Sequence, residues 1–175
     1  MTGEPDWRRA EREYEDYVTE DGTLPELFFA AAERHGSRDA QWYKGGVYDR
    51  SLSGLAFHAA LEGEWASLTY AEMAGIVERL AAGFRELGVE PGDRVGIHAT
   101  TRMEWAQSDF ALLSAGAVVT TVYTESEPER IQYLLDDPGA TGVVVENEEL
   151  LERVLSVEDE LDLEFVAVVD EYESD

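Results

Sequence analysis

The amino-acid sequence predicts an α/β fold built on a mostly parallel, doubly wound sheet. From residue 68 onward, apolar runs of strand length and segments of helical period alternate four times at the spacing of βαβ units. The run at 117–123 is apolar and β-branched without alternation, as expected for a strand that helices cover on both faces. A length of 175 residues allows one such domain or subdomain with a substantial core.

Two segments precede these repeats. Residues 1–23 are polar and acidic, and we expect an arm that packs on another part of the protein or stays loose. The segment 24–67 begins with a short predicted helix, because Pro25 suits a first helical turn and Gly36 suits a helix end. The letters DAQWYK then predict a strand. The rest of this segment lacks a sustained period, which predicts an irregular, exposed insertion.

The third segment, residues 68–175, opens with a helix capping signal. Thr69 and Glu72 form a T-x-x-E capping box, in which each side chain can satisfy a free backbone N–H at a helix start. Gly88 predicts the end of this helix. Its apolar stripe consists of Met73, Ile76, Val77, Leu80, Ala81, Phe84 and Leu87.

The following repeats show the same signals. A Pro-Gly turn leads into a predicted strand at 94–98, and a helix at about 102–114 is expected to stop at Gly116. After the strand at 117–123 comes a further helix.

A second capping box predicts the start of that helix. Ser126 and Glu129 have the required spacing, and Pro128 fits the first turn. Beyond it, TGVVVEN predicts a strand, NEELLERVLSVEDEL a helix and LEFVAVVD a last strand.

The charge of the chain limits its partners. It carries 39 acidic and 13 basic residues, a formal charge of −26, and Lys44 is its single lysine. Such a surface repels phosphate backbones and anionic lipid, so nucleic acid and acidic membranes are poor partners. Carboxylate excess with almost no lysine favours a protein adapted to concentrated salt, where screening reduces self-repulsion. The alternative is an acidic protein from an ordinary cytoplasm.

Composition also restricts chemistry and location. Without cysteine the chain has no disulfide, no thiolate nucleophile and no Cys-ligated zinc. The charged N-terminus is unlike a signal peptide, and no apolar run approaches the ~20 residues of a membrane span. We therefore expect a soluble, cytoplasmic protein without a transmembrane segment.

The carboxyl ends of the predicted strands are the places to look for a ligand, because doubly wound sheets bind ligands there. We predict substrate binding by Tyr123, Thr124 and Ser126, which follow the strand at 117–123. The alternative is a core strand followed by a simple turn.

Other polar groups at these ends have simpler interpretations. His98 could help to hold a phosphate or carboxylate, but a polar strand edge with a helix N-cap from Thr100 or Thr101 is favoured. The acidic groups around Glu146 and Asp170 are interpreted as solvated faces, since acids are expected in the first turn of a helix.

A metal site is not predicted. His58 and Glu62 are four residues apart and could share a helix face. Two ligands do not make a site, so a solvated pair is favoured.

Three motifs in order carry a family resemblance. LTYAEM at 68–73, VEPGDRVGI at 89–97 and LLSAGAVVTTVYTESEPERIQYLLDD at 112–137 resemble the N-terminal subdomain of the AMP-forming adenylating superfamily. Together with the upstream GGVYDRSL insertion they look most like long-chain fatty acyl-CoA synthetases. One departure concerns Thr121 and Thr124, which stand where many members have prolines that stiffen the turn.

The resemblance implies an acid–thiol ligase that uses ATP, Mg²⁺ and coenzyme A in its complete form. Members of the family form an acyl-adenylate, release pyrophosphate and pass the acyl group to the thiol of coenzyme A. The phosphate loop, the acidic residue on the ribose and the catalytic lysine of the family lie downstream of the matching region. The resemblance therefore assigns no catalytic residue and no cofactor to this chain, and we expect residues 68–175 to be truncated before the phosphate loop.

The residues agree with this expectation. The chain has no G-x-x-x-x-G-K-[ST] and no G-x-G-x-x-G, and departure of pyrophosphate needs positive charge and backbone N–H groups at the phosphates. We expect the N-terminal fragment of a synthetase that is inactive alone and whose partner is the remainder of the enzyme. The alternative is a non-catalytic binding or oligomerisation module, for instance a receiver-like flavodoxin fold or a homo-oligomer.

Overall fold

A four-stranded parallel sheet forms the centre of the protein in the computed structural model, which describes residues 6–18, 22–46 and 60–172. The strand order is β4-β3-β5-β6, and every neighbouring pair is parallel. The elements are α1 (Asp6–Val18), α2 (Leu24–His35), β1 (Asp39–Lys44), β2 (Trp65–Thr69), α3 (Tyr70–Glu86), β3 (Arg94–His98), α4 (Met103–Ala115), β4 (Val118–Val122), α5 (Pro128–Asp136), β5 (Ala140–Val145), α6 (Glu148–Leu155), the 3₁₀ helix η2 (Glu158–Glu160) and β6 (Phe165–Val168). The predicted α/β class and parallel sheet are confirmed.

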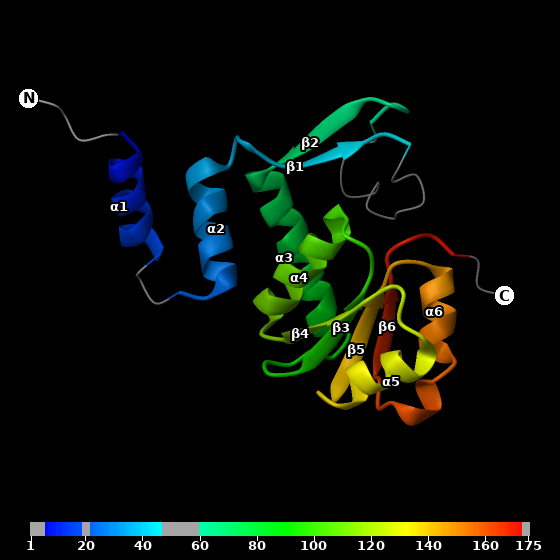
Figure 1. The fold of residues 1–175 in the computed structure, drawn as a ribbon. Helices are drawn as coiled ribbons and strands as arrows, with labels where there is room; N and C mark the ends of the chain where they lie inside the picture. Colours follow the sequence, from blue (N-terminus) through cyan, green and yellow to red (C-terminus); the bar gives the residue numbers. More distant parts are fainter. Residues whose placement is uncertain (1–5, 19–21, 47–59, 173–175) are drawn as a thin grey trace, which may run out of the picture.

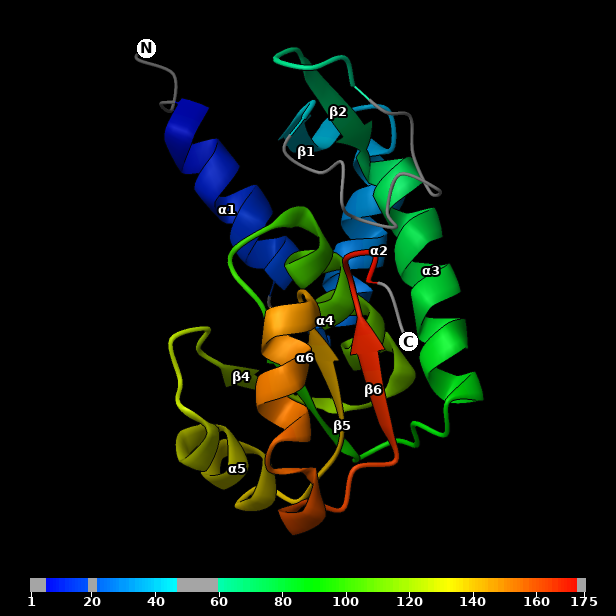
Figure 2. The same ribbon diagram turned by 90° about the vertical axis from the view of Figure 1, so that its right-hand side faces the viewer.

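Helices cover both faces of this sheet (Figures 1 and 2). On one face, α3 and α4 pack with α2 over Val95, Ile97 and Val144. On the other, α5 and α6 pack over Val143 and Val145. Neighbouring residues of β5 thus enter two different cores, as alternation along a doubly covered strand requires.

Glycine at position 96 brings α5 close to the sheet. A Cβ there would lie 2.6 Å from Cδ2 of Leu135 and 3.1 Å from Cγ2 of Val143. A larger residue would require the Leu135 or Val143 side chain to shift, so the close packing of α5 on the sheet explains this glycine.

Two of the predicted helix signals are confirmed by their local geometry. The Thr69 side chain accepts from the Glu72 N–H, and the Glu72 carboxylate accepts from the Thr69 N–H at 2.8 Å. Gly116 ends α4 in the left-handed conformation with φ of 95°.

The second capping box is wrong. Helix α5 begins at Pro128 with Glu127 as its N-cap residue, and no side chain caps it. Ser126 instead belongs to the preceding turn, where its N–H donates to the Tyr123 carbonyl at 3.0 Å.

Two elements were not predicted. Helix α1 lies within the acidic segment 1–23, and β2 pairs antiparallel with β1 in a separate two-stranded sheet. Leu68 of β2 and Tyr43 of β1 are buried against Ile76 and Met103, which anchors this sheet to α3 and α4. Most of the predicted irregular insertion, residues 47–59, lies outside the described residues, as does His58.

Candidate functional site

The order in which strands are added to the sheet changes direction between β3 and β5. From β3 the chain passes through α4 to β4 on one side, and from β4 it returns through α5 to β5 on the other side. Open α/β sheets bind ligands beyond the carboxyl ends of the strands at such a switch point. The candidate site is therefore where His98 and Val145 end their strands.

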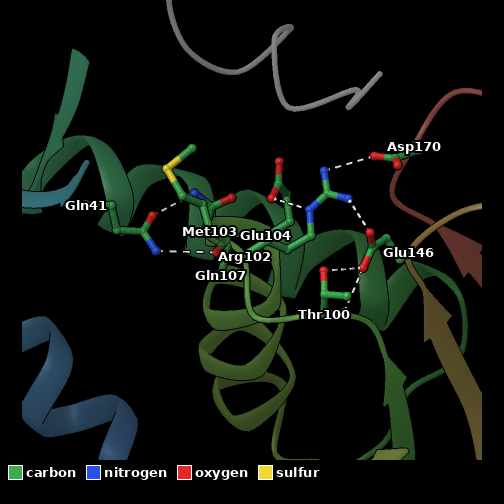
Figure 3. Close-up of polar contacts among 8 residues, drawn as sticks. All are labelled: Gln41, Thr100, Arg102, Met103, Glu104, Gln107, Glu146 and Asp170. Carbon is green, nitrogen blue, oxygen red and sulfur yellow. Dashed lines mark hydrogen bonds and ion pairs between the residues drawn. The ribbon is translucent and has the colours of Figure 1, made fainter. Parts of the chain in front are cut away.

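The Arg102 side chain fills this position (Figure 3). Its Nε lies 2.8 Å from Oε2 of Glu104, its Nη2 lies 2.9 Å from Oδ1 of Asp170, and its Nη1 lies 3.5 Å from Oε1 of Glu146. We call Arg102, Glu104, Glu146 and Asp170 the Arg102 cluster. It joins the start of α4 to the ends of β5 and β6.

Thr100 adds a second link to the same carboxylate. Its N–H and its hydroxyl donate to Oε2 of Glu146 at 2.7 and 2.6 Å. The other carboxylate oxygen of Glu146 faces Arg102, so both oxygens are engaged. The N-cap role expected for Thr100 or Thr101 is wrong, because α4 has Arg102 as its N-cap residue and no side-chain cap.

The cluster is buried. The side chains of Arg102, Glu104, Glu146 and Asp170 are 10%, 6%, 15% and 11% exposed. Burial alone lowers the pKa of Arg102, but the hydrogen bonds and charges of Glu104 and Asp170 outweigh it and raise that pKa, so the guanidinium is permanently charged. The interpretation of Glu146 and Asp170 as solvated faces is wrong, whereas Glu148 is exposed as expected.

Two glutamine side chains connect α4 to the two-stranded sheet of β1 and β2. Nε2 of Gln107 donates to Oε1 of Gln41 at 2.8 Å, and Nε2 of Gln41 donates to the Met103 carbonyl at 3.4 Å (Figure 3). Gln41 belongs to β1, so the helix that presents Arg102 and Glu104 is also held from its other side.

The predicted substrate-binding residues lie beside the switch point, after the edge strand β4. The Tyr123 side chain is 72% exposed, and Thr124 and Ser126 are half-buried. The Thr124 carbonyl accepts from Nη1 of Arg153 at 2.9 Å. The contacts of the Arg102 cluster come from α4 and from the ends of β3, β5 and β6 instead, so the structure does not join these three residues to it.

His98 is fully buried at the end of β3. Its Nδ1 lies 3.2 Å from the Val122 carbonyl, and its Nε2 has no hydrogen-bond partner among the described residues. Burial lowers the pKa of His98, which favours the neutral ring. With Nδ1–H donating to the carbonyl, Nε2 presents a lone pair.

An apolar groove of about 690 Å³ opens next to the Arg102 cluster, on the α3 and α4 face of the sheet. Glu104 and Gln107 line one part of it. Apolar side chains from α3, β5 and β6 form most of its wall, among them Leu80, Phe84, Leu87, Val144, Ala167 and Val169. The predicted apolar stripe of α3 therefore contributes to both the core and the groove. Met73, Val77 and Ala81 are buried, whereas Leu87 is 49% exposed.

Neither a metal cluster nor a membrane-spanning helix is present in the described part of the chain. In the ranges 6–18, 22–46 and 60–172, no group of three His, Asp or Glu side chains is arranged to hold a metal ion. No helix in the same ranges is long and apolar enough to cross a membrane.

Parts of known proteins are similar in sequence to this chain. A family model described as AMP-binding enzyme matches residues 48–175. A long-chain-fatty-acid–CoA ligase of Mycobacterium tuberculosis is 38% identical over 94 residues, which are 54% of this chain and 16% of the relative. A long-chain-fatty-acid–CoA ligase of Rattus norvegicus is 30% identical over 135 residues, which are 77% of this chain and 16% of the relative.

Solved structures share the fold. A long-chain-fatty-acid–CoA ligase of Archaeoglobus fulgidus superposes with a TM-score of 0.70 at 24% identity, over 83% of this chain and 27% of that chain. An anthranilate–CoA ligase in complex with anthranoyl-AMP superposes with a TM-score of 0.56 at 26% identity, over 59% of this chain and 20% of that chain. Because the family model covers more than half of the chain, this protein belongs to the AMP-binding enzyme family, with the fold of an N-terminal subdomain of an acyl-CoA synthetase.

Proposed function

We propose that the chain is the N-terminal part of an ATP-dependent long-chain fatty acyl-CoA synthetase. In the complete enzyme, the fatty acid carboxylate attacks the α-phosphate of Mg²⁺-bound ATP, which forms an acyl-adenylate and releases pyrophosphate. The thiol of coenzyme A then takes the acyl group and AMP leaves. Two relatives support the proposal, because both are named long-chain-fatty-acid–CoA ligases. Their matches cover 54% and 77% of this chain.

The observation that carries the fragment proposal is the open apolar groove beside the last strand. The groove is open and lined mainly by apolar side chains, which suits it to be covered by further apolar side chains. Its walls come from β6 and from the ends of the α3 stripe, where a doubly wound sheet would continue with its next elements. The chain also spans only 16% of the curated relatives' length. The proposed partner is therefore the remainder of the synthetase.

The switch point of this subdomain does not fit the phosphates of ATP. A phosphate site needs cations and backbone N–H groups that can turn toward the anion. Arg102 stands at this point with three carboxylates around it, and the Thr100 N–H already donates to Glu146. The proposed role of the subdomain is to form one wall of the site, and the isolated chain is proposed to be inactive.

The test of the fragment proposal is the size of the native protein. An antibody raised against residues 1–175 is used on an extract of the source cells. A band several times larger than 19.5 kDa is expected. A single band at 19.5 kDa contradicts the proposal and favours a separate module.

The test of inactivity is ATP–pyrophosphate exchange by the purified chain with palmitate and Mg²⁺. No exchange above the background without palmitate is expected. Exchange that depends on palmitate contradicts the proposed inactivity.

The finer assignments remain part of this proposal. Tyr123, Thr124 and Ser126 are proposed to face the substrate region of the complete enzyme, since their loop follows a carboxyl strand end.

The charge of −26 with a single lysine supports a cytoplasm rich in salt. The alternative to a synthetase fragment is an oligomerisation module. Sedimentation of the purified chain in molar KCl tests it, because a discrete homo-oligomer would favour such a module.

A further inference from the structure

The apolar groove lies on one particular face of the parallel sheet. Val144 of β5, and Ala167 and Val169 from β6 and its end, line the groove and pack with the core of α3 and α4. Helices α5 and α6 cover the opposite face. Figure 2 shows α6 and α3 on opposite sides of β6. The groove is thus the part of the sheet face that α3 and α4 leave uncovered.

The order of the strands explains which face each helix covers. The step from β3 to β4 goes one way along the order β4-β3-β5-β6, and its helix α4 lies on the groove face. The steps from β4 to β5 and from β5 to β6 go the other way, and α5 and α6 lie on the opposite face. Connections between parallel strands share one handedness, so a step in the reverse direction places its helix on the other face.

The next connection of the same sheet would therefore not cover the groove. A strand added to the free edge of β6 continues the step from β5 to β6, so its connecting helix would lie with α5 and α6. A return from β6 to the free edge of β4 would place a helix on the groove face. That helix would have to cross α3 and α4, which already pack on Val95 and Ile97.

One wall of the groove carries polar groups that a cover must match. Gln107 and Ser108 of α4 line the groove, although they are only 2% and 5% exposed. Nε2 of Gln107 donates to Gln41, so a cover would meet the amide oxygen of Gln107 and the Ser108 hydroxyl. Once water is excluded, both groups need a hydrogen-bond partner, because an unpaired polar group is costly to bury.

We propose that the groove is a docking face between two folded units of the complete synthetase, and that it receives an amphipathic helix from a unit other than this sheet. This rests on the proposed function, in which the chain continues well beyond the 16% of the relatives' length that it spans. A helix fits because helices cover the faces of such sheets. Its apolar side packs on Leu80, Phe84 and Val144, and one of its polar side chains bonds Gln107 or Ser108.

Photo-crosslinking in the complete enzyme tests the docking face. Leu87 lines the groove and is 49% exposed, so Leu87→Bpa, where Bpa is p-benzoylphenylalanine, places a reactive probe at its edge. The expected crosslink joins Leu87→Bpa to an apolar segment of helical period in the same molecule. This segment should lie more than about 50 residues beyond residue 175, since one further βαβ connection takes about 30 residues.

Four results of this experiment overturn the proposal. A crosslink to the first about 50 residues beyond residue 175 would mean that the sheet's own next connection covers the groove. A crosslink within residues 1–175 or to a second enzyme molecule would identify a different cover. The absence of any crosslink would mean that nothing docks there.

Leu155→Bpa is the matched control, because Leu155 is 42% exposed on α6, on the opposite face of the sheet. It should not reach the segment that Leu87→Bpa reaches, and the same crosslink from both positions contradicts a specific docking face. Both variants should keep the palmitate-dependent ATP–pyrophosphate exchange of the parent enzyme. If Leu87→Bpa is inactive, Arg79→Bpa replaces it, because Arg79 is exposed and lines the same groove.

Hydroxyl-radical footprinting gives a second readout without any substitution. Oxidation of Leu87 should be at least fivefold slower in the complete enzyme than in the isolated chain, both in 2 M KCl. Equal oxidation means that the groove stays open in the complete enzyme, which overturns the proposal. A native protein of 19.5 kDa overturns the proposed function as well, whereas a crosslink close to residue 175 overturns only the docking of a separate unit.

Discussion

The Arg102 guanidinium lies 2.9 Å from the Asp170 carboxylate, and this ion pair connects the segment after β3 to the end of β6 across the intervening strand β5. Glu146 follows β5 and contacts the same guanidinium. One side chain thus fixes the relative positions of three strand ends. This is the arrangement expected of scaffold, because it occupies the switch point with the protein's own charges.

Removal of Arg102 should strongly destabilise the fold. In Arg102→Met, the carboxylates of Glu104, Glu146 and Asp170 lose their shared cation while they stay largely buried. Breaking a buried ion pair on one side typically costs about 3–5 kcal/mol. Urea unfolding at pH 7 measures the loss.

Arg130→Met is the matched control for that experiment. Arg130 is an exposed arginine that lies over the Tyr133 ring, and its loss should change the free energy of unfolding by less than about 1 kcal/mol. If the two variants have equal stability, the Arg102 cluster does not hold the strand ends together.

The stability of two variants compares the confirmed capping box at Thr69 with the wrongly predicted one at Ser126. Thr69→Ala removes a side chain that accepts from the Glu72 N–H, so it should lower the free energy of unfolding by about 1 kcal/mol. Ser126→Ala removes a hydroxyl that does not cap α5 and should cost less than about 0.5 kcal/mol. Thermal and urea unfolding measure both, and equal losses would restore Ser126 as a cap.

Asp109 on α4 should destabilise the protein at neutral pH. Its pKa is raised above the ordinary 3.8 by burial, so the folded state binds this proton more tightly than the unfolded state. The sign follows from linkage: the penalty is absent below pH 3.8, grows as pH rises from there through the folded pKa, and is complete only above the folded pKa. Asp109→Asn should therefore raise the free energy of unfolding at pH 7, with a smaller gain near pH 4.

Asp162→Asn controls for the removal of one negative charge. Asp162 is exposed, and its replacement relieves general repulsion without relieving burial. The gain from Asp109→Asn should exceed that from Asp162→Asn when both are measured by urea unfolding at pH 7. Equal gains would show that net charge, and not burial, accounts for the effect.

Salt should stabilise the protein. With a charge of −26, the folded surface repels itself over a screening length of about 10 Å at 0.1 M salt and about 3 Å at 1 M. The melting temperature should rise by roughly 5 °C or more between 0.1 and 2 M KCl, since each kcal/mol corresponds to about 2–8 °C. The gain should shrink toward the isoelectric point of about 4.2. Calorimetry at both salt levels measures it, and a flat or falling melting temperature would contradict adaptation to salt.

Local signals predicted the helices and strands well because their causes are local. The capping pair of Thr69 and Glu72 and the left-handed Gly116 depend on neighbours within a few residues. Strand β2 was missed because it has a single buried side chain, Leu68, and forms only against β1. Its signal lies in the pairing and not in its own letters.

The Arg102 cluster could not be predicted for the same reason. Its members come from separate elements, and no spacing in the sequence links Glu146 to Asp170 or either one to Arg102. In a chain with 39 acidic residues, a carboxylate after a strand gives no sign of burial. The switch-point rule locates the cluster only once the strand order is known, because that order shows which two strand ends meet.

The apolar groove should bind an apolar probe through Leu87. This side chain is 49% exposed and lines the groove, so Leu87→Asp places a charge in the groove wall at little cost to the core. Fluorescence of anilinonaphthalene sulfonate in 2 M KCl should fall at least twofold in this variant. Leu155→Asp is the matched control, because Leu155 is 42% exposed on α6, on the other face of the sheet, and it should leave the fluorescence unchanged. Equal fluorescence in the parent and both variants would mean that the groove is not an exposed apolar surface in solution, and the proposed docking of the remaining synthetase there would lose its support.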